Sequence, residues 1–261
     1  MEKACIKKIR TNIKKPLASA GFKSEGKRYI RVVNRQICQA FEFQGFSSGD
    51  CFTINLCIFG LCEREIYQGN VKFLPLHMRI GFLLGVGDTW WDYSDESAEK
   101  VTGVILNELL PIFDRVNTYE ALLHEVEEQL VDIPNEKRNP CEMSAYLFMN
   151  KLWGNMSAVC MAVGDYDRAL FCVDNHMKHI ETAHRTRVED LQNNIEQAGE
   201  FSPYKKDFEH YLEEENNLFE KELSHYSSVR SKLVNREYDE LSRMLNAIEE
   251  KNLSCFTKYI I

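Results

Sequence analysis

The spacing of apolar residues changes near residue 21 from a helical period to an extended one. Over Glu2–Ala20 apolar residues recur at intervals of three and four, and this stripe on one helix face consists of Ile6, Ile9, Ile13 and Leu17. Gly21 follows as a helix stop. Beyond it, short apolar-rich runs predict strands over residues 29–33, 36–44 and 51–59, with a tight turn at Asn34-Arg35. The pattern therefore predicts an antiparallel meander beside a helix.

A second group of helices is predicted after these strands. Residues 78–93 are the part of the chain densest in large side chains, and Trp90-Trp91 is expected to form a strand or turn that seals the core. Ser94 then precedes two acidic residues and an apolar run, which is typical of a capped helix start. Another helix is predicted over residues 119–130. Residues 1–133 are thus expected to form an α+β domain, an antiparallel sheet with flanking helices.

The rest of the chain has a helical pattern only. Residues 131–140 contain two prolines among polar residues, and we place a domain boundary there. Downstream, the pattern predicts helices over residues 143–163, from Arg168 to a break at 199–203, over 205–233 and over 238–251. These helices form αα-hairpins, so residues 141–261 are expected to form an all-α helical domain.

Composition limits the class of protein. The chain has 261 residues, of which 44% are hydrophobic and 28% charged, values that are ordinary for a soluble globular protein. No apolar run approaches the roughly 18–20 residues that span a bilayer, and the N-terminus lacks the apolar segment of a secretory signal. The nine cysteines are scattered and form no CxxC pair, which favours free thiols in a reducing compartment. We therefore expect a cytoplasmic protein.

The net charge of −8 is distributed unevenly along the chain. Residues 1–80 carry a net charge of +8, residues 81–135 one of −10, and residues 136–261 one of −6. Such a division indicates either a basic binding face, or basic and acidic helices of one domain that pack together. The second interpretation is favoured because the whole chain is acidic. An acidic partner or nucleic acid stays as the alternative for the basic stripe, which consists of Lys23, Lys27, Arg28, Arg31 and Arg35.

Three residues of a predicted helix could bind a metal ion. Cys172, His176 and His179 fall at i, i+4 and i+7, within about 60° of one another, and are suitable zinc ligands. The opposing interpretation is a helix with Cys172 in its core and histidines at its margin. It is favoured because no HExxH or CxxC motif accompanies the three residues. No nucleophile elbow, kinase signature or phosphate-binding loop is present either, so we assign neither catalytic residues nor a cofactor.

A ligand or partner site is predicted around the paired tryptophans. Aromatic side chains beside acidic ones can line a ligand cleft, which basic side chains would complete. The candidate residues are Arg31, Arg79, Asp88, Trp90 and Trp91. The alternative is that both tryptophans fill the core while the nearby acids cap the next helix.

An ordered series of short segments runs through the first half of the chain. It consists of Lys15-Pro16-Leu17, Gly21-Phe22, Arg31, Phe43-Gln44, Phe52-Thr53-Ile54-Asn55-Leu56, Arg79-Ile80-Gly81, Trp90-Trp91 and Leu110-Pro111. Over about residues 3–130 this series resembles a bacterial domain-of-unknown-function family, number 4304. The resemblance implies a small α+β protein of the kind encoded among toxin–immunity and other variable loci, and an interaction role. It brings no catalytic residues and does not cover residues 141–261.

Two turns in the helical half resemble a repeat family. The segment Gly164–Leu170 (GDYDRAL) is similar to the turn between the helices of tetratricopeptide repeats, and Asn235–Leu241 is a weaker match. The resemblance implies a repeat-like, tetratricopeptide-like helical extension.

Together these observations favour a cytoplasmic bacterial protein that acts as a non-catalytic protein-interaction module, of the immunity or accessory type. It would have a protein partner and no membrane association. Two alternatives stay open. The first is small-ligand binding or catalysis in the α+β part near Trp90 and Trp91, and the second is nucleic-acid association through the basic N-terminal third.

Overall fold

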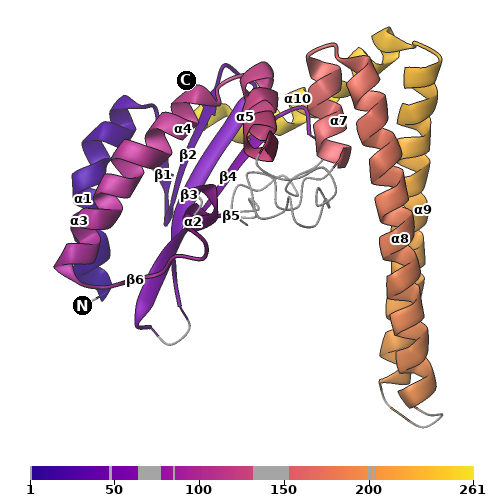
Figure 1. Ribbon diagram of the computed structural model, residues 1–261, viewed down its shortest axis with the longest axis horizontal. Helices are drawn as coiled ribbons and strands as arrows, with labels where there is room; N and C mark the ends of the chain where they lie inside the picture. The colour runs from indigo at the N-terminus through magenta and orange to yellow at the C-terminus, as the bar shows by residue number, and fades with distance from the viewer. Residues whose placement is uncertain are drawn as a thin grey trace.

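The computed structural model describes residues 2–46, 49–63, 78–84, 86–131, 153–198, 202 and 204–261. An antiparallel sheet with helices on both faces forms one side of the molecule, and two long helices project from the other side (Figure 1). The strands are β1 (Lys23–Glu25), β2 (Arg28–Val33), β3 (Ile37–Gly45), β4 (Cys51–Gly60), β5 (Met78–Arg79) and β6 (Trp91–Asp92). The helical segments up to residue 131 are α1 (Glu2–Ser19), α2 (Ile80–Leu83), α3 (Asp95–Val104), η2 (Ile105–Leu109), α4 (Leu110–Arg115) and α5 (Tyr119–Val131). Those after residue 152 are α7 (Trp153–Ala162), α8 (Tyr166–Ala198), α9 (Lys205–Val234), α10 (Tyr238–Phe256) and η4 (Thr257–Tyr259).

The sheet is an antiparallel meander in the order β1-β2-β3-β4-β5, with β6 also paired to β4. Asn34 and Arg35 connect β2 to β3 with positive φ angles of 51° and 57°. Two positive φ angles are those of a type I′ turn, whose twist matches that of the flanking strands. The predicted strands, the turn and the α+β class are thus confirmed.

The first face of the sheet packs against α1 and against the continuous segment α3–η2–α4. Aromatic side chains dominate this core: Phe41 stacks on Tyr29 with ring centroids 4.9 Å apart and contacts Phe113 of α4 at 6.4 Å. Each fully buried side chain of this size contributes on the order of 1.5–3 kcal/mol. The apolar stripe predicted on the first helix faces this core, since Ile9, Ile13 and Leu17 are buried.

Basic and acidic helices of the chain lie side by side on this face. Lys8 of α1 forms ion pairs with Asp95 and Glu99 of α3, both at 3.1 Å. The side chain of Ser94 caps α3 by accepting a hydrogen bond from the backbone of Ser97. Ion pairs between neighbouring helices therefore compensate part of the uneven charge along the chain.

The second face of the sheet packs against the end of the helical half. Phe256 of α10 and Tyr259 of η4 lie in a core with sheet residues, namely Ile30, Val32, Cys38, Ala40, Cys57 and Phe59. Ile260 forms a parallel bridge with Val32. The buried amide of Asn252 donates hydrogen bonds to the carbonyls of Leu61 at 2.8 Å and Glu63 at 2.9 Å. Residues 252–260 thus complete the packing of a sheet made from residues 23–92.

Helices α8 and α9 form an antiparallel hairpin, which we call the arm. At about 1.5 Å per residue, 33 and 30 residues correspond to roughly 50 Å and 45 Å. The arm extends well beyond the rest of the molecule (Figure 1). The predicted helices are confirmed here, although residues 143–152 of the first predicted helix lie outside the described residues.

The two turns that resemble tetratricopeptide turns lie against each other at the base of the arm. Tyr166 at the start of α8 and Tyr238 at the start of α10 stack with ring centroids 3.8 Å apart and an interplanar angle of 6°. A tetratricopeptide unit of about 34 residues contains two helices. Since α8 alone is 33 residues long, the resemblance is limited to the turns.

Candidate functional site

A cluster of aromatic and charged side chains lies at one end of the sheet, which we call the edge surface. It consists of Phe46, Arg79, Asp88 and Trp90, and the exposed Val86 lies two residues before Asp88 in the same loop. The guanidinium of Arg79 lies over the Trp90 ring, 4.7 Å from its centroid, and forms an ion pair with Asp88. Phe46 meets the same ring edge-on at 5.1 Å. Phe46 and Val86 are 48% and 68% exposed, so apolar side chains here face solvent.

Sheet pairing and one close glycine contact hold this surface in place. Arg79 is opposite Asn55 in the β4–β5 pair, and Trp91 is opposite Phe52 in the β4–β6 pair. A Cβ atom on Gly81 would lie 2.0 Å from the carbonyl oxygen of Gly87, so only glycine permits this approach of the loop. The edge surface is therefore built on a fixed backbone.

Arg79, Asp88 and Trp90 form a single electrostatic unit. Burial alone would raise the pKa of Asp88, but hydrogen bonds from Arg79 and from the Trp90 indole outweigh it and lower the pKa below its ordinary value. The carboxylate stays charged and engaged by two donors. This arrangement positions a planar aromatic surface and leaves Asp88 unsuited to act as a general acid near neutral pH.

The structure brings together only some of the predicted candidates. Trp91 lies in β6 with its ring in the core, next to Phe52 at 6.0 Å. The expectation that the tryptophans seal the core thus applies to Trp91, whereas Trp90 faces outward and is half-buried. Arg31 lies in β2, on the other face of the sheet from Arg79.

Arg31 belongs to a buried polar network. Only 4% of it is exposed, and it donates hydrogen bonds to Gln39 at 2.6 Å, to the carbonyl of Ala20 at 2.7 Å and to Asp114 at 2.7 Å. Its guanidinium also lies over the ring of Phe22 at 4.6 Å. All these partners belong to the chain itself, so the contacts of Arg31 join the sheet to α1 and α4.

The other members of the basic stripe are divided between internal contacts and solvent. Arg28 pairs with Glu42 of the neighbouring strand at 2.8 Å, and Lys23 donates to the carbonyl of Lys258. Lys27 and Arg35 are exposed. Two of the five basic side chains, Arg28 and Arg31, are thus neutralised by carboxylates.

Two of the three predicted metal ligands on α8, Cys172 and His176, contact different neighbours, and the third, His179, is half-buried. Cys172 is buried beside Cys160 of α7, and the hydrogen bond between the thiols together with burial raises the pKa of Cys160. His176 packs against Tyr226 of α9, with ring centroids 4.2 Å apart. Within the described residues, no group of three or more His, Cys, Asp or Glu side chains could hold a metal ion. Every cysteine of the described ranges is a free thiol, and Cys141 lies outside them.

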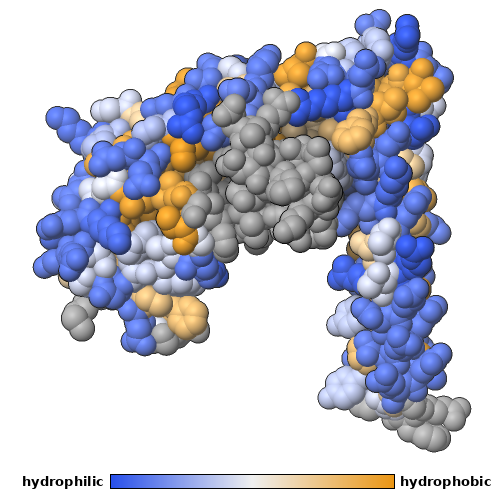
Figure 2. Space-filling model, viewed as in Figure 1, coloured by the Kyte–Doolittle hydropathy of each residue, from blue (hydrophilic) through white to orange (hydrophobic). Residues whose placement is uncertain are grey.

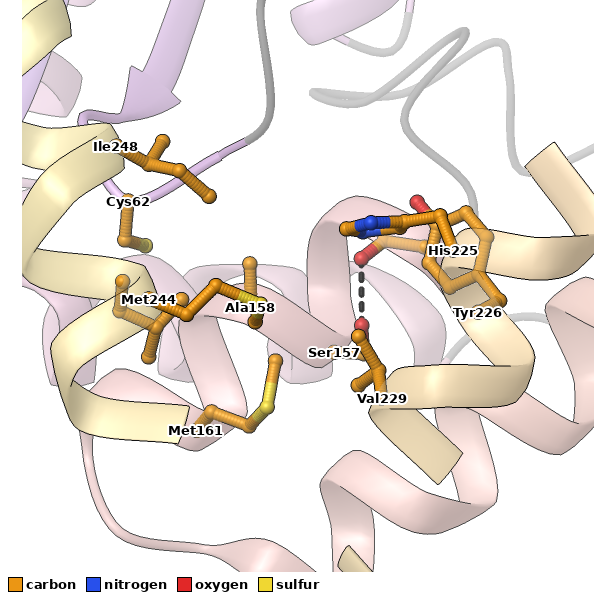
Figure 3. A pocket seen from close by; sticks show the side chains of 11 residues that line it. Cys62, Ser157, Ala158, Met161, His225, Tyr226, Val229, Met244 and Ile248 are labelled. Atoms are coloured by element: carbon orange, nitrogen blue, oxygen red, sulfur yellow. Dashed lines mark hydrogen bonds between the residues drawn. The ribbon is translucent and has the colours of Figure 1, made fainter. Parts of the chain in front are cut away.

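A small cavity of about 20 Å³ lies where α7, α9 and α10 meet the end of β4 (Figure 3). Cys62, Met161 and Met244 contribute sulfur atoms to its wall, and Ser157 donates a hydrogen bond to the carbonyl of Gly154 at 2.6 Å. Burial raises the pKa of Cys62 well above its ordinary value, so this thiol is not an activated nucleophile. The cavity has room for roughly one water molecule and not for an organic substrate.

Next to this cavity lies a hydrogen-bonded pair of side chains that no sequence motif predicts. The Tyr119 hydroxyl donates to Glu249 of α10 at 2.6 Å and also contacts the Cys62 thiol. Burial raises the pKa of Tyr119 well above its ordinary value. The two residues are far apart in the chain and have no fixed spacing, so only the fold reveals the contact.

Comparison with known proteins finds a family that the part of the chain with the sheet resembles. Residues 13–115 match the model of a family described as a domain of unknown function, DUF4304. The match covers 103 of the 261 residues and shows a similarity of this part of the chain to the family. The matched residues include all six strands of the sheet, the edge surface and the Arg31 network, whereas the arm and α10 lie outside them. The resemblance seen in the sequence is thus confirmed.

Two further searches add no relative. No curated protein and no solved structure matches the chain. None of the helices in the described part of the chain has the length and apolar character needed to cross a membrane.

Proposed function

We propose that the chain is a non-catalytic protein-interaction module and that a partner protein binds its edge surface. The stacking of Arg79 on Trp90, with Phe46 against the same ring, is the observation that supports this most directly. Aromatic and arginine side chains supply most of the energetic centres of protein interfaces. Exposed Val86 extends the apolar area beside them.

The chemistry of the site supports recognition better than catalysis. Arg79 and Asp88 neutralise each other, so the surface offers aromatic and aliphatic contact area with little net charge. The partner we expect contributes an apolar or aromatic side chain to the Phe46–Trp90 surface. A cytoplasmic bacterial location and a role of the immunity or accessory type agree with the family resemblance and are part of the proposal.

Affinity capture from the native host tests this function. The full chain serves as bait beside a Phe46→Ala/Trp90→Ala variant and a Phe171→Ala variant, since Phe171 is 57% exposed on α8 and lies away from the sheet. We expect a protein that enriches with the wild type and with the α8 variant and that is lost, by at least about tenfold, with the edge variant. Circular dichroism confirms that all three baits are folded.

Two outcomes would contradict the proposal. One is a partner that the edge variant retains in full. The other is the absence of any enriched protein while a small molecule copurifies with the wild type and not with the edge variant. That second outcome would support the ligand-binding alternative near Trp90 and Trp91.

A further inference from the structure

A row of cationic side chains runs along the solvent-facing side of α1. Lys7, Arg10 and Lys14 follow one another at intervals of three and four residues, which keeps them within about 60° of one another on the helix. Lys7 and Lys14 are exposed, and none of the three forms an ion pair with another described residue. Figure 2 shows this end of the molecule, where Figure 1 places α1 and α3, as a largely hydrophilic surface.

Arg10 is the fixed centre of this row. Its guanidinium lies 5.9 Å from the centroid of the Phe43 ring, and Nη1 donates a single long hydrogen bond, at 3.5 Å, to the carbonyl of Gly26. Its Nε is buried. A guanidinium has five N–H donors in a planar fork. Arg10 is therefore held against the sheet, while its Nη groups retain donors that no described group of the protein engages.

The turn between β1 and β2 widens the row. Gly26 has a φ angle of 59°, and a Cβ atom there would meet nothing within 4 Å, so the turn projects into open space. Lys27 is exposed and forms no ion pair in the part of the chain that the structure describes. The hydrogen bond from Arg10 to Gly26 brings this turn against α1. We call Lys7, Arg10, Lys14 and Lys27 the cationic face.

The acidic residues of the neighbouring strands have cations of their own. Glu25 of β1 accepts hydrogen bonds from Lys258 at 2.6 Å and from Tyr259 at 2.9 Å, on the second face of the sheet. Glu42 of β3 pairs with Arg28 at 2.8 Å. Neither carboxylate neutralises the cationic face.

The acidic residues of α3 lie on the other flank of α1. The first five residues of α3 include three acids, and two of these, Asp95 and Glu99, contact Lys8. Lys8 is two residues from Arg10 and so about 200° away around the helix. In the sequence of α1 the one acidic residue is Glu2. Exposed charges farther apart than about 8 Å are largely screened at physiological ionic strength, so the net charge of −8 does not determine the field at the cationic face.

The cationic face matches phosphate groups that repeat along a polymer. From Lys7 to Lys14 the helix rises by about 10 Å, at about 1.5 Å per residue. Each strand of a duplex carries one phosphate per about 3.4 Å of the axis, so this length meets roughly three phosphates of one strand. Arg10 offers a fork for one phosphate, and the lysines on either side offer point charges for its neighbours.

The surroundings of these cations favour a duplex over other polyanions. The aromatic side chains beneath the row, Tyr29 and Phe43, are 9% and 6% exposed, so they provide no platform on which the bases of a single strand could stack. None of the large apolar side chains exposed in the described residues belongs to α1 or to the β1–β2 turn. The face thus lacks both the apolar anchor of a membrane-binding helix and the aromatic centre of a protein interface.

We propose that the cationic face binds the phosphate backbone of double-stranded nucleic acid, with Arg10 at the centre of the contact and without sequence preference. Contacts to phosphates position a protein on a duplex and carry no sequence information. Binding of this kind has a Kd of about 10⁻⁴ to 10⁻⁶ M at physiological salt and depends steeply on the salt concentration.

Fluorescence anisotropy of a labelled DNA duplex tests this proposal. The full chain is titrated into the duplex at several NaCl concentrations between about 50 and 200 mM. Four cations on phosphates predict a slope of log K against log salt between about −3 and −4, because each contact contributes about −0.9. In the variant Lys7→Gln/Lys14→Gln we expect a slope shallower by about 2, and binding at least about tenfold weaker at about 100 mM salt.

A matched control removes the same charge from the arm. Lys206 and Lys221 are exposed on α9, and the variant Lys206→Gln/Lys221→Gln should bind the duplex within about twofold of wild type, with the wild-type slope. A duplex of unrelated sequence should bind wild type within about twofold as well. Circular dichroism establishes that both variants are folded.

Several results would overturn the proposal. One is a wild type with a Kd above about 1 mM at about 50 mM salt, outside the range of non-specific binding. Others are equal losses in the α1 and arm variants, tighter binding to a single strand of the same length, or binding to anionic lipid vesicles without binding to the duplex. The variant Phe46→Ala/Trp90→Ala should bind the duplex like wild type, so the proposed function of the edge surface is tested separately.

Discussion

Replacement of Gln39 by Leu tests whether the polar network of Arg31 holds the sheet to α4. The Gln39 amide is fully buried, accepts from Arg31 at 2.6 Å and donates to the carbonyls of Phe113 and Val116, both at 2.6 Å. Leu has a similar volume and leaves no large cavity, so the effect reports on hydrogen bonding. Three buried polar groups lose a partner, at about 1–3 kcal/mol each when isolated. Because the carbonyls lie at a helix end and relax together, we expect a total loss of roughly 3–5 kcal/mol.

Urea unfolding followed by tryptophan fluorescence and circular dichroism measures this loss. The free-energy change comes from the shift of the midpoint at an unchanged slope. Gln44→Leu provides the control, because Gln44 lies at the exposed end of the same strand and its loss should change stability by about 0.5 kcal/mol or less. If the free energies of unfolding of the two variants agree within about 1 kcal/mol, the network does not stabilise the fold to the extent expected. A double variant with Arg31→Met should lose less than the sum of its parts, since both residues belong to one network.

Three further predictions concern other parts of the chain. Gly81→Ala should destabilise the fold by about 1–3 kcal/mol, because the added Cβ atom would meet the carbonyl oxygen of Gly87. Gly103→Ala, at a helix position with free space, should be neutral or stabilise the fold by up to about 1 kcal/mol. Urea unfolding measures both changes. Phe256→Ala should cost about 3–5 kcal/mol and Thr257→Ala less than about 0.5 kcal/mol; equal losses would show that α10 does not support the sheet. Because the folded-state pKa of Asp88 is lowered, its stabilising contribution is present above the unfolded pKa of about 3.9 and is lost as pH falls through the folded value. Tryptophan fluorescence should therefore change in acid, and a titration of Asp88→Asn with the same change below pH 4 would contradict the assignment.

Local signals in the sequence were sufficient for most elements. Strand periodicity, the Asn34-Arg35 turn and the Ser94 cap each depend on neighbours within a few residues, and the structure has all three. Pro16 lies inside α1, which continues past it to Ser19. Its missing hydrogen bond would involve the carbonyl of Asn12, an exposed residue, where water can take the place of the amide.

Long-range contacts were beyond local reasoning. The sequence of β2 has apolar residues on both faces of the strand, which indicates that both faces of the sheet are covered. Nothing in this sequence specifies that Phe256 and Tyr259 cover the second face. Arg31 was grouped with Arg79 by residue type, and its burial depends on Gln39 and on Asp114, a residue far along the chain. The edge surface was partly anticipated because Asp88 and Trp90 are close in sequence. Phe46 carried no signal there, since its approach to Trp90 arises from pairing of β4 with β6.

The return of the chain to the second face of the sheet determines the order in which the molecule can mature on the ribosome. All strands and the helices of the first face emerge early, yet the apolar side chains of Ile30, Val32 and Phe59 stay uncovered until Phe256 and Tyr259 have been made. At about 5–20 residues per second, synthesis of the residues between α4 and Phe256 takes roughly 7 to 28 seconds. During that interval the second face of the nascent sheet stays uncovered, and the arm has been synthesised before Phe256 and Tyr259 cover that face.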